Sequence, residues 1–189
     1  LGLTPMIESG GLGFFLLLLG AMCWADDLYS LSSLFRFIFH CLVVGMAILA
    51  GLLDSLIFGG FFPPLVDRVV TGILWVWFMN IFNFMDGIDG LAAIETVSIC
   101  IGIILLVSFS GLNKEMGYFA LLLAGATFGF LLWNWSPAKI FLGDVGSVPI
   151  GFLLGWLLLS LISKGYWAAA LIFPAYFITD ATVTLARRL

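Results

Sequence analysis

Charged side chains are scarce in this sequence, and no basic cluster is present. Only 10% of the 189 residues are charged, whereas 63% are hydrophobic and the mean hydropathy is +1.22. A water-soluble domain of this length needs far more polar surface to cover its core. The absence of a Lys/Arg cluster disfavours nucleic-acid binding. We therefore expect a membrane protein that binds no nucleic acid.

Histidine occurs once and cysteine three times, and these residues form no ligand pair. Without a Cys-x-x-Cys pair or a Cys/His cluster, a structural zinc site and a disulfide framework are both disfavoured. Cys23, Cys41 and Cys100 lie in or beside apolar runs, so we interpret them as packing residues. We interpret His40 as a neutral packing residue within a helix.

Apolar runs recur along the whole chain. Runs of about 16–20 residues suit helices that cross about 30 Å of hydrocarbon. The short alternating segments typical of a membrane β-barrel are missing. We predict an all-α fold, a polytopic transmembrane helical bundle that forms one integral membrane domain over residues 1–189. Its seven apolar segments are 10–25, 34–53, 69–85, 91–110, 118–134, 148–163 and 166–181.

Two further features of the chain concern its loops and its ends. The stretch Leu56–Leu65 contains two glycines and two prolines, and we expect an interfacial or re-entrant loop there. The chain begins at Leu1 and stops at Leu189 just after a basic pair, so we expect a fragment or a processed chain. Its start lacks the charged region that opens a signal peptide.

The order of the segments places the acidic loops on one side of the membrane. A spanning helix leaves on the side opposite its entry, so alternate connections share a side. The connections after the first, third and fifth segments carry Asp26, Asp27, Asp86, Asp89 and Asp144. The opposite connections carry acids in no repeated pattern. Five aspartates from three loops are thus predicted to converge on one membrane face.

The positive-inside rule assigns that face to the cytoplasm. Four basic residues lie on the aspartate side and three lie opposite, and the difference sets the orientation. The basic residues are Arg36, Lys139, Arg187 and Arg188 on the aspartate side, and Arg68, Lys114 and Lys164 on the other.

Two of the acidic loops carry paired carboxylates. Asp26 and Asp27 are adjacent, so ionising both in a partly dry site needs a cation or strong hydrogen bonds. Asp86 and Asp89 are three residues apart and share a face if their turn is helical. Asn83 precedes them, and an amide this close to hydrocarbon needs hydrogen-bond partners. A solvated loop or a capping turn explains either pair taken alone.

The third acidic loop places one carboxylate among small residues. Asp144 is flanked by Gly143 and Gly146, whose backbone N–H groups suit an anion. We predict that Ser147 is the N-cap of the sixth helix and that Pro149 lies in its first turn. A Gly-rich turn with a capping serine explains the glycines but not the acid.

Helix direction and ligand chemistry together favour a metal–phosphate site. The second, fourth and sixth segments begin on the aspartate side, so their partly positive N-termini point toward the acids. Lys139 is close enough in sequence to meet a phosphate oxygen. Carboxylates without a His or Cys cluster favour Mg²⁺ or Mn²⁺ over zinc. These residues alone do not name a substrate.

Three motifs occur in a recognisable order and spacing. They are ADD-x-x-S-L at 25–31, NFMDGIDGLA at 83–92 and PAKIFLGDVGS at 137–147. In these motifs the chain resembles the polyprenyl-phosphate N-acetylhexosamine-1-phosphate transferases over essentially its whole length. That family includes the initiators of O-antigen and enterobacterial common antigen and the phospho-MurNAc-pentapeptide translocase. In their residues, the last two motifs are most similar to those of the O-antigen-initiating branch.

The resemblance implies a Mg²⁺-dependent enzyme that transfers an N-acetylhexosamine 1-phosphate from a UDP-sugar to undecaprenyl phosphate, releasing UMP. It implies catalytic roles for Asp26, Asp27, Asp86 and Asp89. It implies metal binding by Asp144 and Asp27. Asp180 also resembles an aspartate that the family has near the end of a late helix. It implies substrate or cofactor binding by Asn83, Asn134, Lys139, Gly143, Gly146 and Ser147. We also expect a multi-pass protein of the plasma (inner) membrane, and a homodimer is a further expectation.

One departure and several alternatives accompany this resemblance. The family has more spanning helices than seven, and its C-terminal cytoplasmic His-rich loop follows a basic pair like Arg187–Arg188. We therefore expect N-terminal helices and that loop to lie outside this chain. The nearest alternative is the phospho-MurNAc-pentapeptide transferase of peptidoglycan synthesis. An ion-coupled transporter is an alternative of another class, although its acids usually lie near the bilayer midplane. The signatures of intramembrane aspartyl proteases and CDP-alcohol phosphotransferases are incomplete here.

Overall fold

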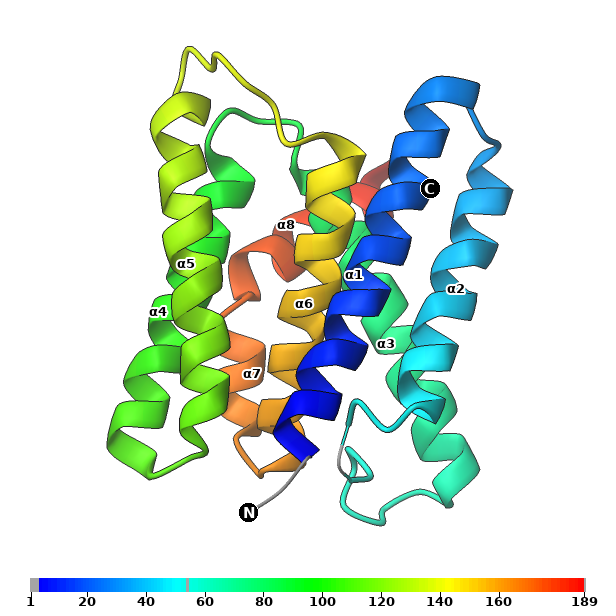
Figure 1. Ribbon diagram of the computed structural model, residues 1–189, viewed down its shortest axis with the longest axis vertical. Coiled ribbons are helices and arrows are strands. Elements are labelled where there is room, and N and C mark those ends of the chain that lie inside the picture. Colours follow the sequence, from blue (N-terminus) through cyan, green and yellow to red (C-terminus); the bar gives the residue numbers. More distant parts are fainter. Residues whose placement is uncertain (1–3, 54, 189) are drawn as a thin grey trace. The chain divides into compact units, whose positions relative to one another are not determined.

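The computed structural model describes residues 4–53 and 55–188, and within these ranges it contains eight helices and no strand (Figure 1). The ends of the chain at Leu1 and Leu189 lie outside the described residues. The predicted all-α fold is confirmed. The helices are α1 (Thr4–Tyr29), α2 (Ser33–Leu49), α3 (Pro64–Met85), α4 (Leu91–Ser110), α5 (Lys114–Asn134), α6 (Gly143–Ser163), α7 (Trp167–Ile172) and α8 (Ala175–Arg188).

Five of the described helices are long and apolar enough to cross a membrane, namely α1, α3, α4, α5 and α6. Helix α2 is also apolar but has only 17 residues. These helices correspond to the first six predicted segments, and their number indicates a multi-pass membrane protein.

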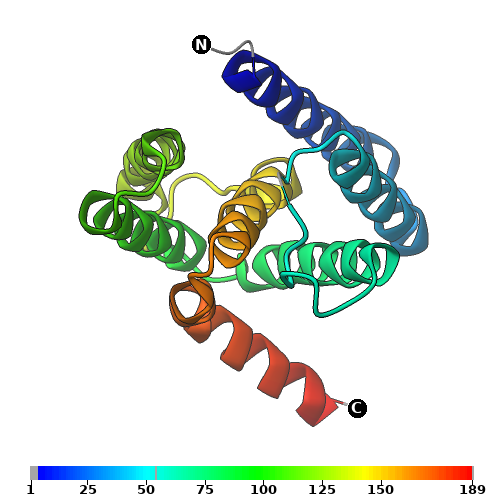
Figure 2. The same cartoon turned by 90° about the horizontal axis from the view of Figure 1, so that it is seen from below.

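The seventh predicted segment is not one helix. It is divided into α7, of six residues, and α8, which begins again at Ala175. Pro174 lies at the break, and proline lacks the backbone N–H that would continue the helical hydrogen bonding. Figure 2 shows α7 end-on while α8 lies across the view. The segment is apolar enough for a spanning helix, but the prediction of one continuous helix over residues 166–181 is wrong.

The chain divides into two compact units. Unit 1 contains residues 1–80 and 144–165, and unit 2 contains residues 81–143 and 166–189. Unit 1 thus holds α1, α2, most of α3 and nearly all of α6, and unit 2 holds α4, α5, α7 and α8. The prediction that the whole chain forms one membrane domain stays a prediction.

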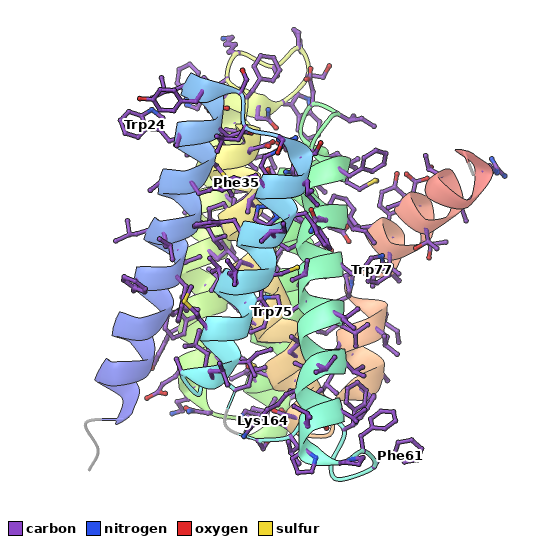
Figure 3. All side chains as sticks on the ribbon, turned by 90° about the vertical axis from the view of Figure 1, so that its right-hand side faces the viewer. Trp24, Phe35, Phe61, Trp75, Trp77 and Lys164 are labelled. Carbon is purple, nitrogen blue, oxygen red and sulfur yellow. The ribbon has the colours of Figure 1, made fainter. Side chains whose placement is uncertain are left out.

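The core of unit 1 is an aromatic contact between α3 and α6. Trp75 is fully buried and stacks on Phe152, with ring centroids 4.6 Å apart and an interplanar angle of 23°. The indole N–H of Trp75 also donates to the Phe152 carbonyl at 2.9 Å. Trp77, two residues along α3, points away and is 39% exposed (Figure 3). One face of α3 therefore packs and the other faces outward.

A buried aspartate organises the loop between α2 and α3. Asp67 is 1% exposed, and its carboxylate accepts hydrogen bonds from the N–H groups of Ile57 at 3.0 Å and Phe58 at 2.9 Å. The loop stays non-helical until α3 begins at Pro64, as the sequence predicts. Phe61 is 82% exposed on this loop, at the end of unit 1 that carries Lys164 (Figure 3). Its interfacial or re-entrant position stays a prediction.

In unit 2, α4 and α5 lie side by side (Figure 1), and their tight turn uses Gly111 at φ 69°. Glu95 of α4 is 8% exposed, and the backbone of Phe177 in the first turn of α8 lies beside its carboxyl. The start of α8 therefore lies next to a buried acidic side chain of α4.

The three cysteines are free thiols. Cys23 and Cys100 are buried, as expected of packing residues. Cys41 is exposed on α2, so the packing interpretation is wrong for this residue. It lies beside Phe37 and Val44 along an apolar groove lined by residues of α2 and α3.

Gly155 provides a test of the α3–α6 contact. A Cβ at this position would lie 2.6 Å from Cδ1 of Trp75, closer than real Cβ contacts allow. We predict that Gly155→Ala lowers the free energy of unfolding by about 1–3 kcal/mol, because the stacked tryptophan must shift. Thermal unfolding in detergent, followed by size-exclusion chromatography, measures the change. Gly129→Ala is the control, since nothing lies within 4 Å of its Cβ position in α5. Equal melting temperatures for the two variants would contradict the packing account.

Candidate active site

The turn between α1 and α2 is built around Asp26. The Asp26 carbonyl accepts from the N–H of Ser30 at 2.7 Å, and its Oδ1 accepts from the N–H of Leu31 at 2.7 Å. Ser30 takes a positive φ of 51°, which reverses the chain. Ser32 then caps α2 by accepting from the N–H of Phe35 at 3.3 Å. The sequence thus fixes both the last turn of α1 and the first turn of α2.

The first turn of α2 brings Arg36 between two carboxylates of unit 1. Its Nη1 lies 3.0 Å from Oδ2 of Asp26 and 3.0 Å from Oδ2 of Asp144. The side chains of Asp26, Arg36 and Asp144 are 11%, 36% and 31% exposed, respectively. Asp144 also lies in the first turn of α6, where the helix dipole stabilises a carboxylate. We call these three residues the ion cluster.

Asp27 is oriented differently from its neighbour. Its side chain is exposed and makes no hydrogen bond or ion pair with any residue that the structure describes. Successive residues of a helix point about 100° apart, so the two carboxylates of this pair do not share one position. The repulsion that the sequence indicates is avoided by Arg36 on one acid and by solvent on the other.

The donor chemistry of the ion cluster suits a divalent cation. Mg²⁺ is usually held by one or two carboxylates together with waters and substrate phosphates. Asp26 and Asp144 could supply such a pair if Arg36 moved away. Among the described residues, no three His, Cys, Asp or Glu side chains are grouped to hold a metal ion. The metal-binding roles of Asp144 and Asp27 stay predictions.

His40 lies one helical turn beyond Arg36 and is only 4% exposed. Neither ring nitrogen makes a hydrogen bond of standard geometry, although the Asn80 side chain lies beside the imidazole. Arg36 and Asp144 are close enough to act on the ring electrostatically. The helical position and the burial of His40 agree with the sequence interpretation of a packing residue within a helix. The four-residue spacing from Arg36 was the available signal.

In unit 2, Asn134 connects the second and third acidic loops. Its Oδ1 accepts from the N–H of Gly90 at 2.9 Å, and its Nδ2 donates to the carbonyl of Ile140 at 2.9 Å. Asn134 is 6% exposed, so both bonds form in a largely dry place. Gly90 has a φ of 76°, a left-handed conformation that favours glycine. The asparagine therefore acts as a clamp between the two loops.

Asp89 adds a second connection between these loops. Its Oδ2 accepts from the N–H of Ala138 at 3.0 Å. Asp86 is half-buried, and its N–H donates to the Asn83 carbonyl at 3.2 Å, so the segment is a turn rather than a continued helix. Lys139 is exposed, with its Nζ 5.5 Å from the centre of the Trp133 ring. Its predicted phosphate contact requires it to leave that cation–π position.

The start of α6 differs from the prediction. Ser147 is not the N-cap, because α6 already begins at Gly143 and Ser147 is a fully buried residue inside the helix. Pro149 is likewise inside α6 instead of in its first turn, and it removes one backbone hydrogen bond. Gly143 takes a φ of 61°, which allows the chain to enter the helix there. Gly146 lies within the helix, so it is not part of a flexible loop.

The comparison with known families agrees with these motifs. Residues 10–162 match the model of the family described as glycosyl transferase family 4. The chain belongs to glycosyl transferase family 4. The matched region includes the ion cluster and both loops joined by Asn134, so the family match covers the candidate site.

The similar curated proteins of this family have two kinds of name. The probable undecaprenyl-phosphate N-acetylglucosaminyl 1-phosphate transferase of Bacillus subtilis is 32% identical over 93% of the chain and 51% of that protein. The decaprenyl-phosphate N-acetylglucosaminephosphotransferase of Mycolicibacterium smegmatis is 33% identical over 82% and 40%. The phospho-N-acetylmuramoyl-pentapeptide-transferase of Streptococcus thermophilus is 32% identical over 94% and 55%. The chain spans about half the length of these relatives.

The Asn134 clamp generates a prediction about loop dynamics. Asn134→Leu leaves the buried N–H of Gly90 without its acceptor, which costs about 1–3 kcal/mol. We expect faster amide hydrogen exchange in both residues 86–91 and residues 135–142, measured by mass spectrometry. Asn113→Ala is the control, because Asn113 is an exposed N-cap of α5 that contacts neither loop. Faster exchange in only one of the two loops would contradict the clamp.

Proposed function

We propose that this protein transfers an N-acetylhexosamine 1-phosphate from a UDP-sugar to a polyprenyl phosphate within the membrane. The observation that carries the proposal is the ion cluster, in which acids from α1 and α6 meet one guanidinium. Family membership supports the same reaction class. Two relatives are named for a polyprenyl-phosphate acceptor and an N-acetylglucosamine phosphate group. The UDP carrier and the undecaprenyl acceptor follow from the motif resemblance.

The proposed reaction forms one phosphorus–oxygen bond and breaks another. An oxygen of the acceptor phosphate attacks the β-phosphorus of the UDP-sugar, and UMP leaves with the electrons of the broken bond. A phosphomonoester has a second pKa near about 6, so the acceptor is largely a dianion at neutral pH and needs no strong base. Asp26 or Asp27 could accept a residual proton, position the acceptor or hold metal. A covalent aspartyl intermediate is the alternative route.

The chain's own charges suit a diphosphate substrate. Arg36 can offer parallel N–H donors to phosphate oxygens. The N-termini of α2, α4 and α6 each add partial positive charge. Asp144 with Asp26 or Asp27 would hold Mg²⁺ or Mn²⁺, which when bound neutralises the diphosphate and the departing UMP.

The residues of unit 2 have proposed roles in the same reaction. Segment order in the sequence assigns Asp86, Asp89 and Asn83 to the same membrane face as the ion cluster. Asn134 and Asp89 hold the two loops that carry these residues and Lys139. We therefore assign this region to donor binding and keep the individual roles open.

We also propose a branch of the family, on the basis of the residues within two of the motifs. NFMDGIDG and WNWSPAKIFLGD favour initiation of an O-antigen type lipopolysaccharide, with a UDP-N-acetylhexosamine donor. The phospho-N-acetylmuramoyl-pentapeptide-transferase relatives make peptidoglycan synthesis the competing assignment. We propose the plasma membrane as location, the cytoplasmic face for the site, and a homodimer as assembly.

A transfer assay tests this function. Full-length protein in nanodiscs is incubated with Mg²⁺, undecaprenyl phosphate and either a UDP-N-acetylhexosamine or UDP-MurNAc-pentapeptide, and UMP is measured. We expect UMP release that requires both acceptor and metal, and a loss of at least about 100-fold in Asp144→Asn, because charge stabilisation is lost. Glu115→Gln is the control, since Glu115 is at the N-terminus of α5, far along that helix from Asn134.

Three outcomes would contradict the proposal. Near-normal turnover in Asp144→Asn would remove its assigned role. If UMP is released with UDP-MurNAc-pentapeptide as donor and not with a UDP-N-acetylhexosamine, the protein belongs to the peptidoglycan branch instead. Ion-coupled uptake by proteoliposomes without any UMP release would favour a transporter.

A further inference from the structure

Arg36 occupies the position between two carboxylates that a metal ion would need. A single nitrogen, Nη1, lies 3.0 Å from one oxygen of Asp26 and 3.0 Å from one oxygen of Asp144. Each bond is a charge-assisted hydrogen bond. The guanidinium thereby neutralises acids from two helices that would otherwise repel each other.

Arg36 opposes a divalent cation at this position. A +2 ion bound by both carboxylates would lie close to the guanidinium between them, and the two positive charges would repel each other strongly at this short range. The side chain of Arg36 is 36% exposed, so it has an open side toward which it can move. Arg36 and a divalent cation therefore compete for the space between Asp26 and Asp144.

We propose that Arg36 is a displaceable counter-cation of this site, an inference that rests on the proposed function. Without substrate, Arg36 holds Asp26 and Asp144 and keeps a divalent cation out. When the nucleotide sugar binds, the guanidinium transfers to its diphosphate oxygens, which it matches in charge and geometry. The two carboxylates are then available to the metal. Binding of metal and binding of diphosphate are therefore positively coupled, and each increases the affinity for the other by the same factor.

Mn²⁺ binding measured by electron paramagnetic resonance tests this exchange. Full-length protein in nanodiscs is titrated with Mn²⁺ alone, without any nucleotide. We expect Arg36→Gln to bind Mn²⁺ on the order of 10-fold more tightly than the wild type, because its competitor is gone. Arg68→Gln is the matched control, since Arg68 is an exposed arginine in the first turns of α3 and has no ion pair among the described residues. Unchanged or weaker Mn²⁺ binding by Arg36→Gln would overturn the proposal.

A second measurement covers the case in which Arg36→Gln does not fold. Wild-type protein is titrated with Mn²⁺ with and without UDP-N-acetylglucosamine, after correction for Mn²⁺ bound by the free nucleotide sugar. We expect on the order of 10-fold tighter Mn²⁺ binding when the sugar nucleotide is present. Independent binding of the two ligands would contradict the exchange.

The UMP assay separates this inference from the proposed function. UMP release by the wild type, without a gain in Mn²⁺ affinity in Arg36→Gln, would refute the exchange alone. A gain in Mn²⁺ affinity without UMP release from any donor would support the exchange and refute the transferase.

Discussion

Electrostatic neutralisation in a low-polarity setting constrains unit 1 more than any other interaction. Asp26 lies in the last turn of α1, Arg36 in the first turn of α2 and Asp144 in the first turn of α6, so one guanidinium connects three helix termini. Removing either acid from its partner would leave a half-buried charge uncompensated, which is costly. The hydrogen bonds of Asp26 to its own turn bring the arginine to this position. The local turn and the long-range ion pair therefore depend on the same carboxylate.

In unit 2, hydrogen bonds instead of ion pairs join the two loops of the candidate site among the residues that the structure describes. Its two loops are joined by neutral hydrogen bonds of Asn134 and by a charged one of Asp89. An amide side chain offers both a donor and an acceptor, so one residue can bind a loop N–H and a loop carbonyl together. Lys139 then remains exposed on a loop whose backbone is fixed. Such a division between residues that hold a loop and residues that face outward is common at sites that bind polar ligands.

The sequence alone is sufficient to predict the all-helical membrane fold, whereas the predicted roles of the site residues stay predictions. Composition and apolar length are sufficient for that, because a spanning helix must satisfy its backbone internally. The predicted start of α6 is wrong by about one turn. The helix already begins at Gly143 and Asp144, so Ser147 lies inside it and cannot be its N-cap. The break at Pro174 was missed because the apolar run continues through it. The ion pairs of Arg36 could not be predicted, since they depend on which helices become neighbours.

The position of Glu95 beside Phe177 has a consequence for how unit 2 can move. A tilt of α8 at its break would carry the Phe177 backbone away from a buried carboxyl group and change the polarity around that group. Helix α4 begins directly after the turn that carries Asp89, and Glu95 lies only four residues into this helix. A lipid or neighbouring chain that pressed on α8 would therefore alter the surroundings of α4 close to the acidic turn.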